Sequence, residues 1–378
     1  MLFRSRLLHT ADWQIGRQFS SLDPEHAPIL ADARLAAVER LAALAVEHRV
    51  DAVLVAGDVF DAQTVSERTL RRCFNAMAGY TGPWLLLPGN HDAALAESVW
   101  SRVGRLGLAP PNVHLMLAPE PMVLPALRLT VLPAPLTQRH TYADLTEWFD
   151  QAASPEDHWR VGLAHGSVQG LLAEDIDSPN PIAPDRPERA RLDYLALGDW
   201  HGQRLLGPRM AYSGTPEPDR FKANGAGQAL LVELPAPGAE PRLQPLATAQ
   251  YRWQTLEAAL QVESDLDLLL ARLDTLGPQD VVDLRLQGQL DLAAHARLSD
   301  GLARAAARAR HLQTDLGALR LAPTDEDLSR LQAEGYLGEV LAELRAVPPD
   351  DPGARTAQDA LALLASLLMA RQGPEVAA

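Results

Sequence analysis

The sequence predicts an α/β fold, and three observations support this prediction. Short apolar runs alternate with helical patterns over residues 5–90. Five apolar runs end abruptly in Asp, Asn, Gln or His residues. A Pro- and Gly-rich stretch at residues 234–247 separates these runs from a second, smaller group of strand and helix patterns. The chain therefore begins as an α/β domain and continues into a smaller one.

The first part of the chain has the pattern of βαβ units. Residues 5–12 and 50–58 are apolar runs of strand length, and residues 29–48 between them repeat apolar residues at helical spacing. Residues 66–80 predict a second helix that begins with a serine cap, and residues 83–90 predict a third strand. This order favours a parallel sheet.

Later strands lie closer together, with fewer helices between them. They are predicted at residues 127–135, 160–166, 193–199, 209–214 and 227–234. This spacing is typical of a part of the fold that is rich in hairpins.

Beyond the boundary, strands and helices alternate again. Residues 251–258, 280–290 and 311–322 predict strands, and residues 265–276 and 293–310 predict helices between them. These elements are enough for a small α/β domain.

After Pro323 the pattern is helical. One apolar stripe comprises Leu328, Leu331, Tyr336, Leu337, Val340, Leu341 and Leu344, and residues 360–369 form a second apolar segment. Two interpretations remain open at this point: the helices cover the smaller domain, or they dock against a partner protein.

Composition limits the class of protein. A chain of 378 residues suits about two domains, and 47% hydrophobic with 22% charged residues is typical of a soluble globular protein. No apolar run reaches the ~18 residues of a membrane span, and the first residues lack the pattern of a signal peptide, so we expect a cytoplasmic location without membrane contact. Cys73 is the single cysteine, which excludes an intrachain disulfide and a thiolate metal site.

The net charge of −15 argues against a general, charge-driven nucleic-acid binder. It does not exclude a nuclease, because bound dications and a local arginine patch reverse the field at one face.

The polar clusters at the strand ends are the strongest functional signal. In open α/β sheets, functional residues gather beyond the carboxyl ends of the strands. A lone Asp there is more often a turn or a helix cap, and a lone His is more often a core residue. Five clusters at five strand ends instead indicate a cation site. The residues are Asp12, Gln14, Asp58, Asp61, Asn90, His91, Asp92, His165, Asp199 and His201.

These clusters resemble a known pattern. "LLHTADWQIG", "VLVAGDVFD", "LLLPGNHD", "GLAHG", "YLALGDWHG" and "YSGTPE" follow one another between Leu7 and Glu217. In order and spacing they resemble the D-x-H, G-D-x-x-D, G-N-H-D/E, lone His and G-H-x-H motifs of calcineurin-type metallophosphoesterases. Within that superfamily the sequence is similar to the SbcD-type DNA repair exonucleases, the nuclease partners of an SMC-like ATPase.

The resemblance implies a four-layer α-β-β-α sandwich with a smaller α/β capping domain and a C-terminal helical tail. We expect the nuclease domain at residues 1–245, the capping domain at residues 246–323 and the tail at residues 324–378. It also implies DNA and an SbcC-like, SMC-like ATPase as partners, with the tail as the docking element, and it leaves a homodimer open.

The resemblance further implies a pair of divalent metal ions that activate a hydroxide for phosphodiester hydrolysis. Asp12 and His201 would bind the first ion, Asp58 would bridge both, and Asn90 and His165 would bind the second. Hard oxygen ligands with imidazole suit Mn²⁺ best, although Mg²⁺, Fe or Zn²⁺ would also fit.

His91 would lie over the scissile phosphate and protonate the leaving alkoxide, with Asp61 or Asp92 orienting its ring. Two positions depart from the pattern, because Gln14 and Asp199 stand where the family has histidines. Asp199 is a competent replacement ligand. Gln14 either ligates a metal weakly or only hydrogen-bonds to a metal-bound water.

Candidate substrate contacts lie beside these motifs. Trp13 and Trp200 either pack beneath the metal loops or stack on a nucleobase. Tyr212 and Arg220 follow the last strand of the motif region, where they predict a structural turn with a phosphate contact.

The sequence thus favours an SbcD-like, Mn²⁺-dependent DNA exonuclease or endonuclease. A phosphoesterase of the same fold that acts on a small molecule or a phosphoprotein is the first alternative, but the large C-terminal region disfavours it. The second alternative is a non-catalytic scaffold whose site has decayed at Gln14 and Asp199. The presence of the other motif residues argues against decay.

Overall fold

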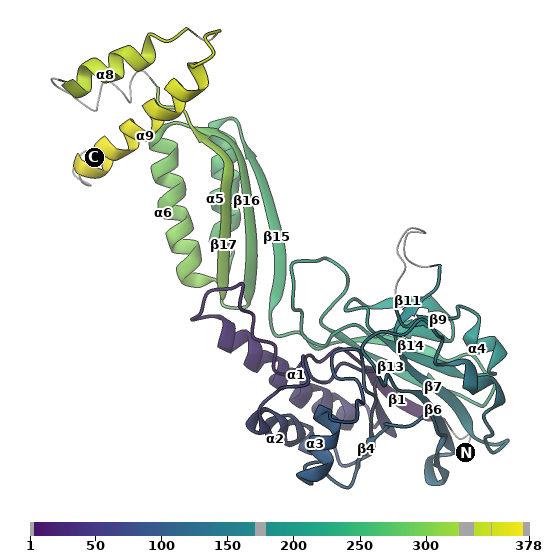
Figure 1. Cartoon of the computed structure of the whole chain (residues 1–378). Coiled ribbons are helices and arrows are strands. Elements are labelled where there is room, and N and C mark those ends of the chain that lie inside the picture. Colours follow the sequence, from purple (N-terminus) through teal and green to yellow (C-terminus); the bar gives the residue numbers. More distant parts are fainter. Residues whose placement is uncertain (1–3, 171–178, 325–335, 349, 373–378) are drawn as a thin grey trace. The chain divides into compact units, whose positions relative to one another are not determined.

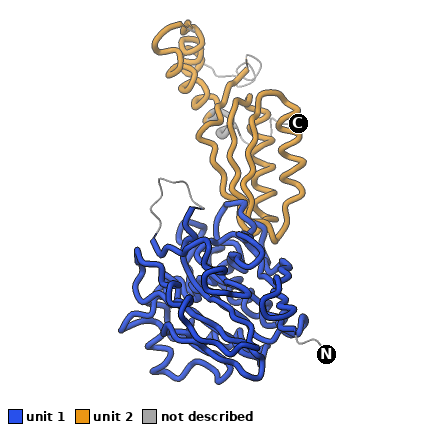
Figure 2. The backbone as a smooth tube through the Cα atoms, turned by 90° about the vertical axis from the view of Figure 1, so that its right-hand side faces the viewer, with its two compact units in different colours: residues 1–252 blue, residues 253–378 orange. Residues whose placement is uncertain are grey.

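The computed structural model describes residues 4–170, 179–324, 336–348 and 350–372 (Figure 1). The chain divides into two compact units, residues 1–252 and residues 253–378 (Figure 2). Each unit has its own hydrophobic core.

The first sheet of unit 1 has six strands in the order β14-β13-β1-β2-β3-β4. Strands β1, β2, β3 and β4 run parallel to one another. Strand β13 pairs antiparallel with β1, and β14 pairs antiparallel with β13. The strands are β1 (Ser5–Thr10), β2 (Ala52–Val55), β3 (Trp84–Leu86), β4 (Val113–Leu115), β13 (Gln228–Leu234) and β14 (Arg242–Ala247).

Three helices cover the outer face of this sheet: α1 (Ala27–Glu47), α2 (Glu67–Ala76) and α3 (Val99–Arg105). Side chains alternate along each strand, so Leu8 packs toward the helices and Leu7 packs toward the second sheet. Helix α2 begins at the predicted serine cap, because the Ser66 hydroxyl accepts a hydrogen bond from the Thr69 N–H.

The second sheet has the order β11-β12-β10-β7-β6-β5, with four parallel strands in the middle. Its strands are β5 (Met122–Leu124), β6 (Leu129–Ala134), β7 (Trp159–His165), β10 (Tyr194–Gly198), β11 (Arg204–Gly207) and β12 (Met210–Tyr212). One face packs against the first sheet, and the other is covered by η3 (Glu147–Gln151) and the segment around α4 (Arg186–Arg189). The predicted four-layer sandwich is therefore confirmed.

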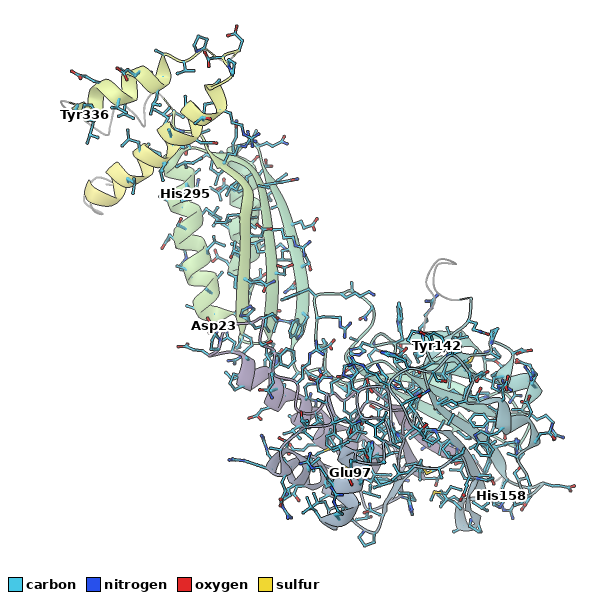
Figure 3. The ribbon with its side chains drawn as sticks, viewed as in Figure 1. Asp23, Glu97, Tyr142, His158, His295 and Tyr336 are labelled. Carbon is cyan, nitrogen blue, oxygen red and sulfur yellow. The ribbon has the colours of Figure 1, made fainter. Side chains whose placement is uncertain are left out.

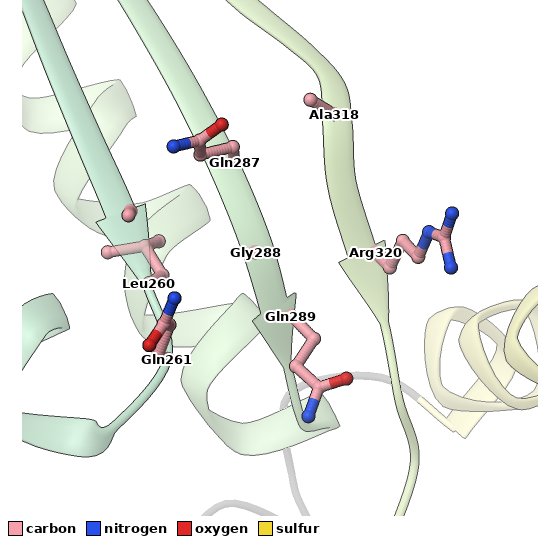
Figure 4. Close-up of a pocket in the computed structure, with 8 residues that line it drawn as sticks. Leu260, Gln261, Gln287, Gly288, Gln289, Ala318 and Arg320 are labelled. Carbon is pink, nitrogen blue, oxygen red and sulfur yellow. The ribbon is translucent and has the colours of Figure 1, made fainter.

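Unit 2 contains the strands and helices predicted after the boundary. They are β15 (Arg252–Leu260), α5 (Glu263–Asp274), β16 (Asp280–Leu290), α6 (Leu292–Arg308) and β17 (His311–Leu321). The three strands form one sheet, and both helices pack on one of its faces. A pocket at the end of this sheet has a polar lining that includes Gln261, Gln287, Gln289 and Arg320 (Figure 4).

The described C-terminal residues include two helices, α8 (Tyr336–Arg345) and α9 (Ala354–Gln372). Leu341 of α8 and Ala365 of α9 are buried together with Leu292 of α6, so both helices pack within unit 2. Tyr336 is 77% exposed (Figure 3). Leu328 and Leu331 of the predicted stripe lie outside the described residues. No described helix is long and apolar enough to cross a membrane.

Candidate metal centre

Both sheets contribute to one site. Asp12, Gln14, Asp58 and Asn90 follow the first three parallel strands of the first sheet, whereas His165, Asp199 and His201 lie at the ends of β7 and β10 in the second sheet. Because the carboxyl ends of parallel strands meet at one edge, these residues gather where the two sheets adjoin.

Asp12, Asp58 and His165 form the centre of the site. One ligand atom from each lies within 4.8 Å of the others, and all three residues are buried. The Nε2 atom of His165 is 3.6 Å from Oδ1 of Asp58. Carboxylate oxygen and imidazole nitrogen converging in this way are ligands for a divalent cation.

The hydrogen bonds of His165 direct one ring nitrogen into the site. Nδ1 lies 2.8 Å from the main-chain oxygen of Ala56, to which it donates, and Nε2 lies 2.9 Å from Oδ1 of Asn90. A histidine that donates one ring N–H to a carbonyl offers the other nitrogen as a ligand. Asn90 and His165 thus meet at the site, as the sequence predicts.

Asp199 faces the same cluster. Its main-chain N–H donates to Oδ1 of Asp12 at 3.1 Å, and its carboxylate Oδ1 lies 3.7 Å from Nε2 of His165. The Oδ2 atom accepts a hydrogen bond from Ser167. A carboxylate therefore occupies the position beside His165 where the family motif has a histidine.

Gln14 contacts the cluster through its amide group. Nε2 donates to Oδ2 of Asp58 at 2.7 Å, and the side chain is fully buried. Its Oε1 is buried and has no hydrogen-bond partner among the described residues. A buried oxygen without a partner is costly, so it marks the place where Gln14 would meet a ligand.

His91 borders the cluster without joining it. Its main-chain N–H donates to Oδ1 of Asp58 at 2.9 Å, and its ring Nδ1 lies 2.9 Å from the main-chain oxygen of Asp61. Nδ1 donates to this carbonyl, which fixes the ring and leaves Nε2 as the nitrogen that can exchange a proton.

The carboxylates of Asp61 and Asp92 do not orient this histidine ring, in contrast to the sequence-based hypothesis. Asp61 lies 3.5 Å from Arg17. Asp92 accepts hydrogen bonds from the main-chain N–H groups of Gly89 and Phe60 and so shapes the loops. Burial, together with the charge of Asp58, raises the pKa of Asp92 to about 8.

A carboxylate that sequence reasoning missed holds His201. Nδ1 of His201 lies 3.0 Å from Oδ2 of Asp219 and 2.9 Å from Nη2 of Arg220, and Asp219 is buried between Arg17 and Arg220. Burial raises the pKa of Asp219, but the hydrogen bonds and charges of His201 and Arg220 outweigh burial and lower it well below the usual range. The signal in the sequence is the acid that follows "YSGTPEP".

Arg34 is the second residue that was missed. It lies on α1, is 1% exposed, and donates to the main-chain oxygens of Asp12, Trp13 and Glu217 and to the hydroxyl of Thr215. The guanidinium therefore joins the turn that carries Asp12 to the loop that leads to Asp219.

The turns of the site are conformationally strained. Asp12, Gln14, Asp58 and Asp199 have φ angles of 55°, 49°, 54° and 101°, where residues other than glycine are uncommon. Such outliers cluster at functional sites, since only a well-packed surrounding structure maintains them.

Small residues make room for the ligands. A Cβ atom on Gly57, whose φ is +92°, would lie 2.2 Å from the ring of His165, and a Cβ atom on Gly89 would lie 2.2 Å from Oδ1 of Asp58. Gly57 thus serves a sharp turn, and Gly89 serves the close approach of Asp58.

The charge balance also fits a cation. Burial raises the pKa of Asp12 to about 6. Burial lowers the pKa of His165, but the negative charges of Asp58, Asp12 and Asp199 outweigh it and raise the pKa to about 9. The carboxylates thus stabilise positive charge at the centre of the site, which is what a divalent cation would supply.

The candidate substrate contacts separate into two groups. Trp13 is 1% exposed and packs edge-on against Trp84, so the stacking hypothesis for it is set aside. The Tyr212 hydroxyl is buried and bonded to the main chain of Gly166, which leaves it no surface for substrate. Trp200 is half-buried and Arg220 is exposed, so both remain accessible.

Comparisons with known proteins agree with this geometry. Residues 5–203 match the calcineurin-like phosphoesterase family. The SbcD subunit of nuclease SbcCD from Rhodobacter capsulatus is 30% identical over 73% of this chain and 76% of that protein. The corresponding protein of Escherichia coli K12 is 30% identical over 58% of this chain and 62% of that protein. DNA double-strand break repair protein Mre11 of Aeropyrum pernix is 29% identical over 61% of this chain and 58% of that protein.

The family match contains every residue from Asp12 to His201 that converges at the edge of the two sheets. The similarity to the Rhodobacter capsulatus protein covers 73% of this chain, which is more than unit 1 alone. The chain therefore belongs to the calcineurin-like phosphoesterase family, as a member of its SbcD type.

Proposed function

We propose that this protein is an SbcD-like phosphodiesterase that cleaves DNA with the help of two divalent metal ions. The observation that carries the proposal is the buried group of Asp12, Asp58 and His165, which combines converging ligand atoms with strained turns. The names of the relatives support DNA as the substrate, because they are a nuclease and a double-strand break repair protein.

The residues around Asp58 suggest how the ions would be held. Asp12 and His201 would bind one ion, Asn90 and His165 would bind the other, and Asp58 would serve both, with Gln14 and Asp199 as additional oxygen ligands. This oxygen-rich set favours Mn²⁺, with Mg²⁺, Fe or Zn²⁺ as less favoured ions. When bound, such ions would supply Lewis acidity and lower the pKa of water at the site.

His91 would act on the substrate itself. Its ring is fixed by the carbonyl of Asp61, so Nε2 is the atom that would deliver a proton to the leaving alkoxide. Asp219 would have a positioning role, because its carboxylate lies 3.0 Å from Nδ1 of His201.

The first test is a cleavage assay on linear, nicked and hairpin DNA. We expect cleavage with Mn²⁺, no cleavage after treatment with a chelator, and recovery when Mn²⁺ is added back. Cleavage that persists in the chelator would contradict metal dependence. A protein that hydrolyses bis(p-nitrophenyl) phosphate but no DNA would contradict the proposed substrate.

Gln14→His is expected to tighten metal binding. Imidazole is a better ligand than an amide oxygen for Mn²⁺ and similar ions, and histidine is among the residues that tolerate the positive φ of this position. Isothermal titration of the chelator-treated protein with Mn²⁺ measures the effect. Gln18→His, at an exposed position nearby, is the matched control. Unchanged affinity in Gln14→His would mean that this side chain does not reach the metal.

We further propose that the two C-terminal helices contact an SMC-like ATPase that corresponds to SbcC, since the relatives are named as one subunit of the nuclease SbcCD. Tyr336 and Leu367 are 77% and 59% exposed on these helices. Changing both to Asp should abolish co-purification with the ATPase encoded in the same cell and leave the circular dichroism unchanged. Leu268→Asp, at a position 71% exposed on α5, is the control. Undiminished co-purification of the double variant would place the contact elsewhere.

A further inference from the structure

Two cations lie over the ring of Trp200, which stands between Asp199 and His201 in the sequence. The Nζ atom of Lys222 is 4.8 Å from the ring centroid, and the guanidinium carbon of Arg204 is 5.8 Å from it. Both distances fall within the ~6 Å over which a cation is attracted to an aromatic face. Lys222, the single lysine of the chain, thus belongs to a cluster beside the metal centre.

The ring is held firmly, whereas the cations are exposed. Trp200 is half-buried and packs against the hydrophobic cluster on the outer face of the second sheet. Lys222 and Arg204 are both exposed. Trp200 therefore acts as a fixed platform that limits where two long, flexible side chains place their charges.

Among the described residues, Lys222 and Arg204 form no ion pair with a carboxylate, although the chain has 49 acidic and 34 basic residues. By contrast, the neighbouring Arg220 is bound to Asp219. In so acidic a protein, two unpaired cations on one ring leave a site for an anion supplied by a ligand.

We propose that Lys222 and Arg204, positioned by Trp200, bind a backbone phosphate of a single DNA strand. This phosphate would lie next to the phosphodiester that is brought to Asp12, Asp58 and His165, so the inference rests on the proposed function. The cations already lie over the ring, which means that Trp200 serves the strand by holding them and not by stacking on a base. Cations combined with an aromatic side chain are typical of single-strand binding surfaces.

The chemical consequence is selection for polynucleotides. A small phosphodiester has one phosphate and gains nothing from a second phosphate site, whereas a strand places a phosphate on each side of the one to be cleaved. The two cations would also offset the repulsion between DNA and a chain of net charge −15.

The test measures the binding of a fluorescein-labelled single-stranded oligonucleotide by anisotropy, without added divalent ions, over a series of salt concentrations. Each phosphate contact on a single strand contributes roughly 0.7 to the slope of log K against log salt. We expect Lys222→Ala and Arg204→Ala each to weaken binding and to reduce the slope by part of this amount, because the two cations share one phosphate. Lys222→Arg should restore the slope, since it keeps the charge.

Arg242→Ala is the matched control. Arg242 is exposed and begins β14, next to Glu233 of β13, and this end of the sheet is opposite to the edge that carries Asp12. The slope of log K against log salt for Arg242→Ala should equal that of the unaltered protein. Equal slopes in Lys222→Ala, Arg204→Ala and Arg242→Ala would overturn the phosphate site.

Cleavage of the same strand in Mn²⁺ by the unaltered protein tests the proposed function separately. Cleavage together with unchanged salt slopes in the variants would contradict the phosphate site and support the nuclease function. Reduced slopes without cleavage would contradict the nuclease function and support a strand-binding surface.

Discussion

Asp58→Asn should eliminate detectable cleavage of both DNA and bis(p-nitrophenyl) phosphate. The two oxygens of Asp58 accept hydrogen bonds from Gln14 and from the main chain of His91, and the same carboxylate belongs to the buried group of ligand atoms with Asp12 and His165. An amide removes the negative charge and replaces one acceptor by a donor. Losing residues that merely orient ligands costs ~10–100-fold, so a loss greater than ~100-fold is expected for a ligand itself.

The matched control is Asp32→Asn. Asp32 lies on the exposed side of α1 in an ion pair with Arg72, and surface pairs of this kind contribute little. Both variants should melt as cooperatively as the unaltered protein. If Asp58→Asn retained normal turnover and metal content, the assignment of the central ligand would be wrong.

His91→Ala should lower the cleavage rate by ~10²–10⁴-fold, which is the usual contribution of a general acid, while metal affinity stays unchanged. The structure explains this separation, because His91 contacts Asp58 through its main-chain N–H, which alanine retains. Only the ring held by the carbonyl of Asp61 is lost.

Single-turnover cleavage measures the rate of His91→Ala, and titration with Mn²⁺ measures its metal affinity. His295→Ala, on α6 of unit 2, controls for the loss of a histidine outside unit 1 (Figure 3). A fall in metal affinity parallel to the fall in rate would make His91 a ligand and not an acid. A substrate with a better leaving group should recover part of the lost rate.

Much of the site could be predicted from the sequence because its residues follow strands. Runs such as residues 50–58 are recognisable by composition, and parallel strands bring their carboxyl ends to one edge. Strand β14 was missed because it lies within the Pro- and Gly-rich stretch at residues 234–247, and other missed strands are short. Strands β4 and β5 have three residues each, too few for a periodic pattern to be visible.

Other features depend on packing that the sequence does not reveal. Arg34 stands four residues from the buried Leu30 and Val38 on one face of α1, and it is buried because four oxygens converge on its guanidinium. Trp13 adjoins Asp12 in the sequence, but the left-handed turns on either side direct its ring into the core. The spacing of residues in the sequence does not show that the main-chain oxygen of Asp61 contacts the ring of His91. It also does not show that His201 pairs with Asp219.

The division of the site between two sheets has a consequence for synthesis on the ribosome. β1, which leads to Asp12, is completed only when β13 pairs with it, and β13 ends at Leu234. The hydrogen bonds of Arg34 to Thr215 and Glu217 likewise form only after these two residues have been synthesised. A nascent chain that has emerged only as far as β7 carries most of the cation-binding side chains but not the framework that brings them together. The centre is therefore assembled late, once the whole sandwich is available to fold.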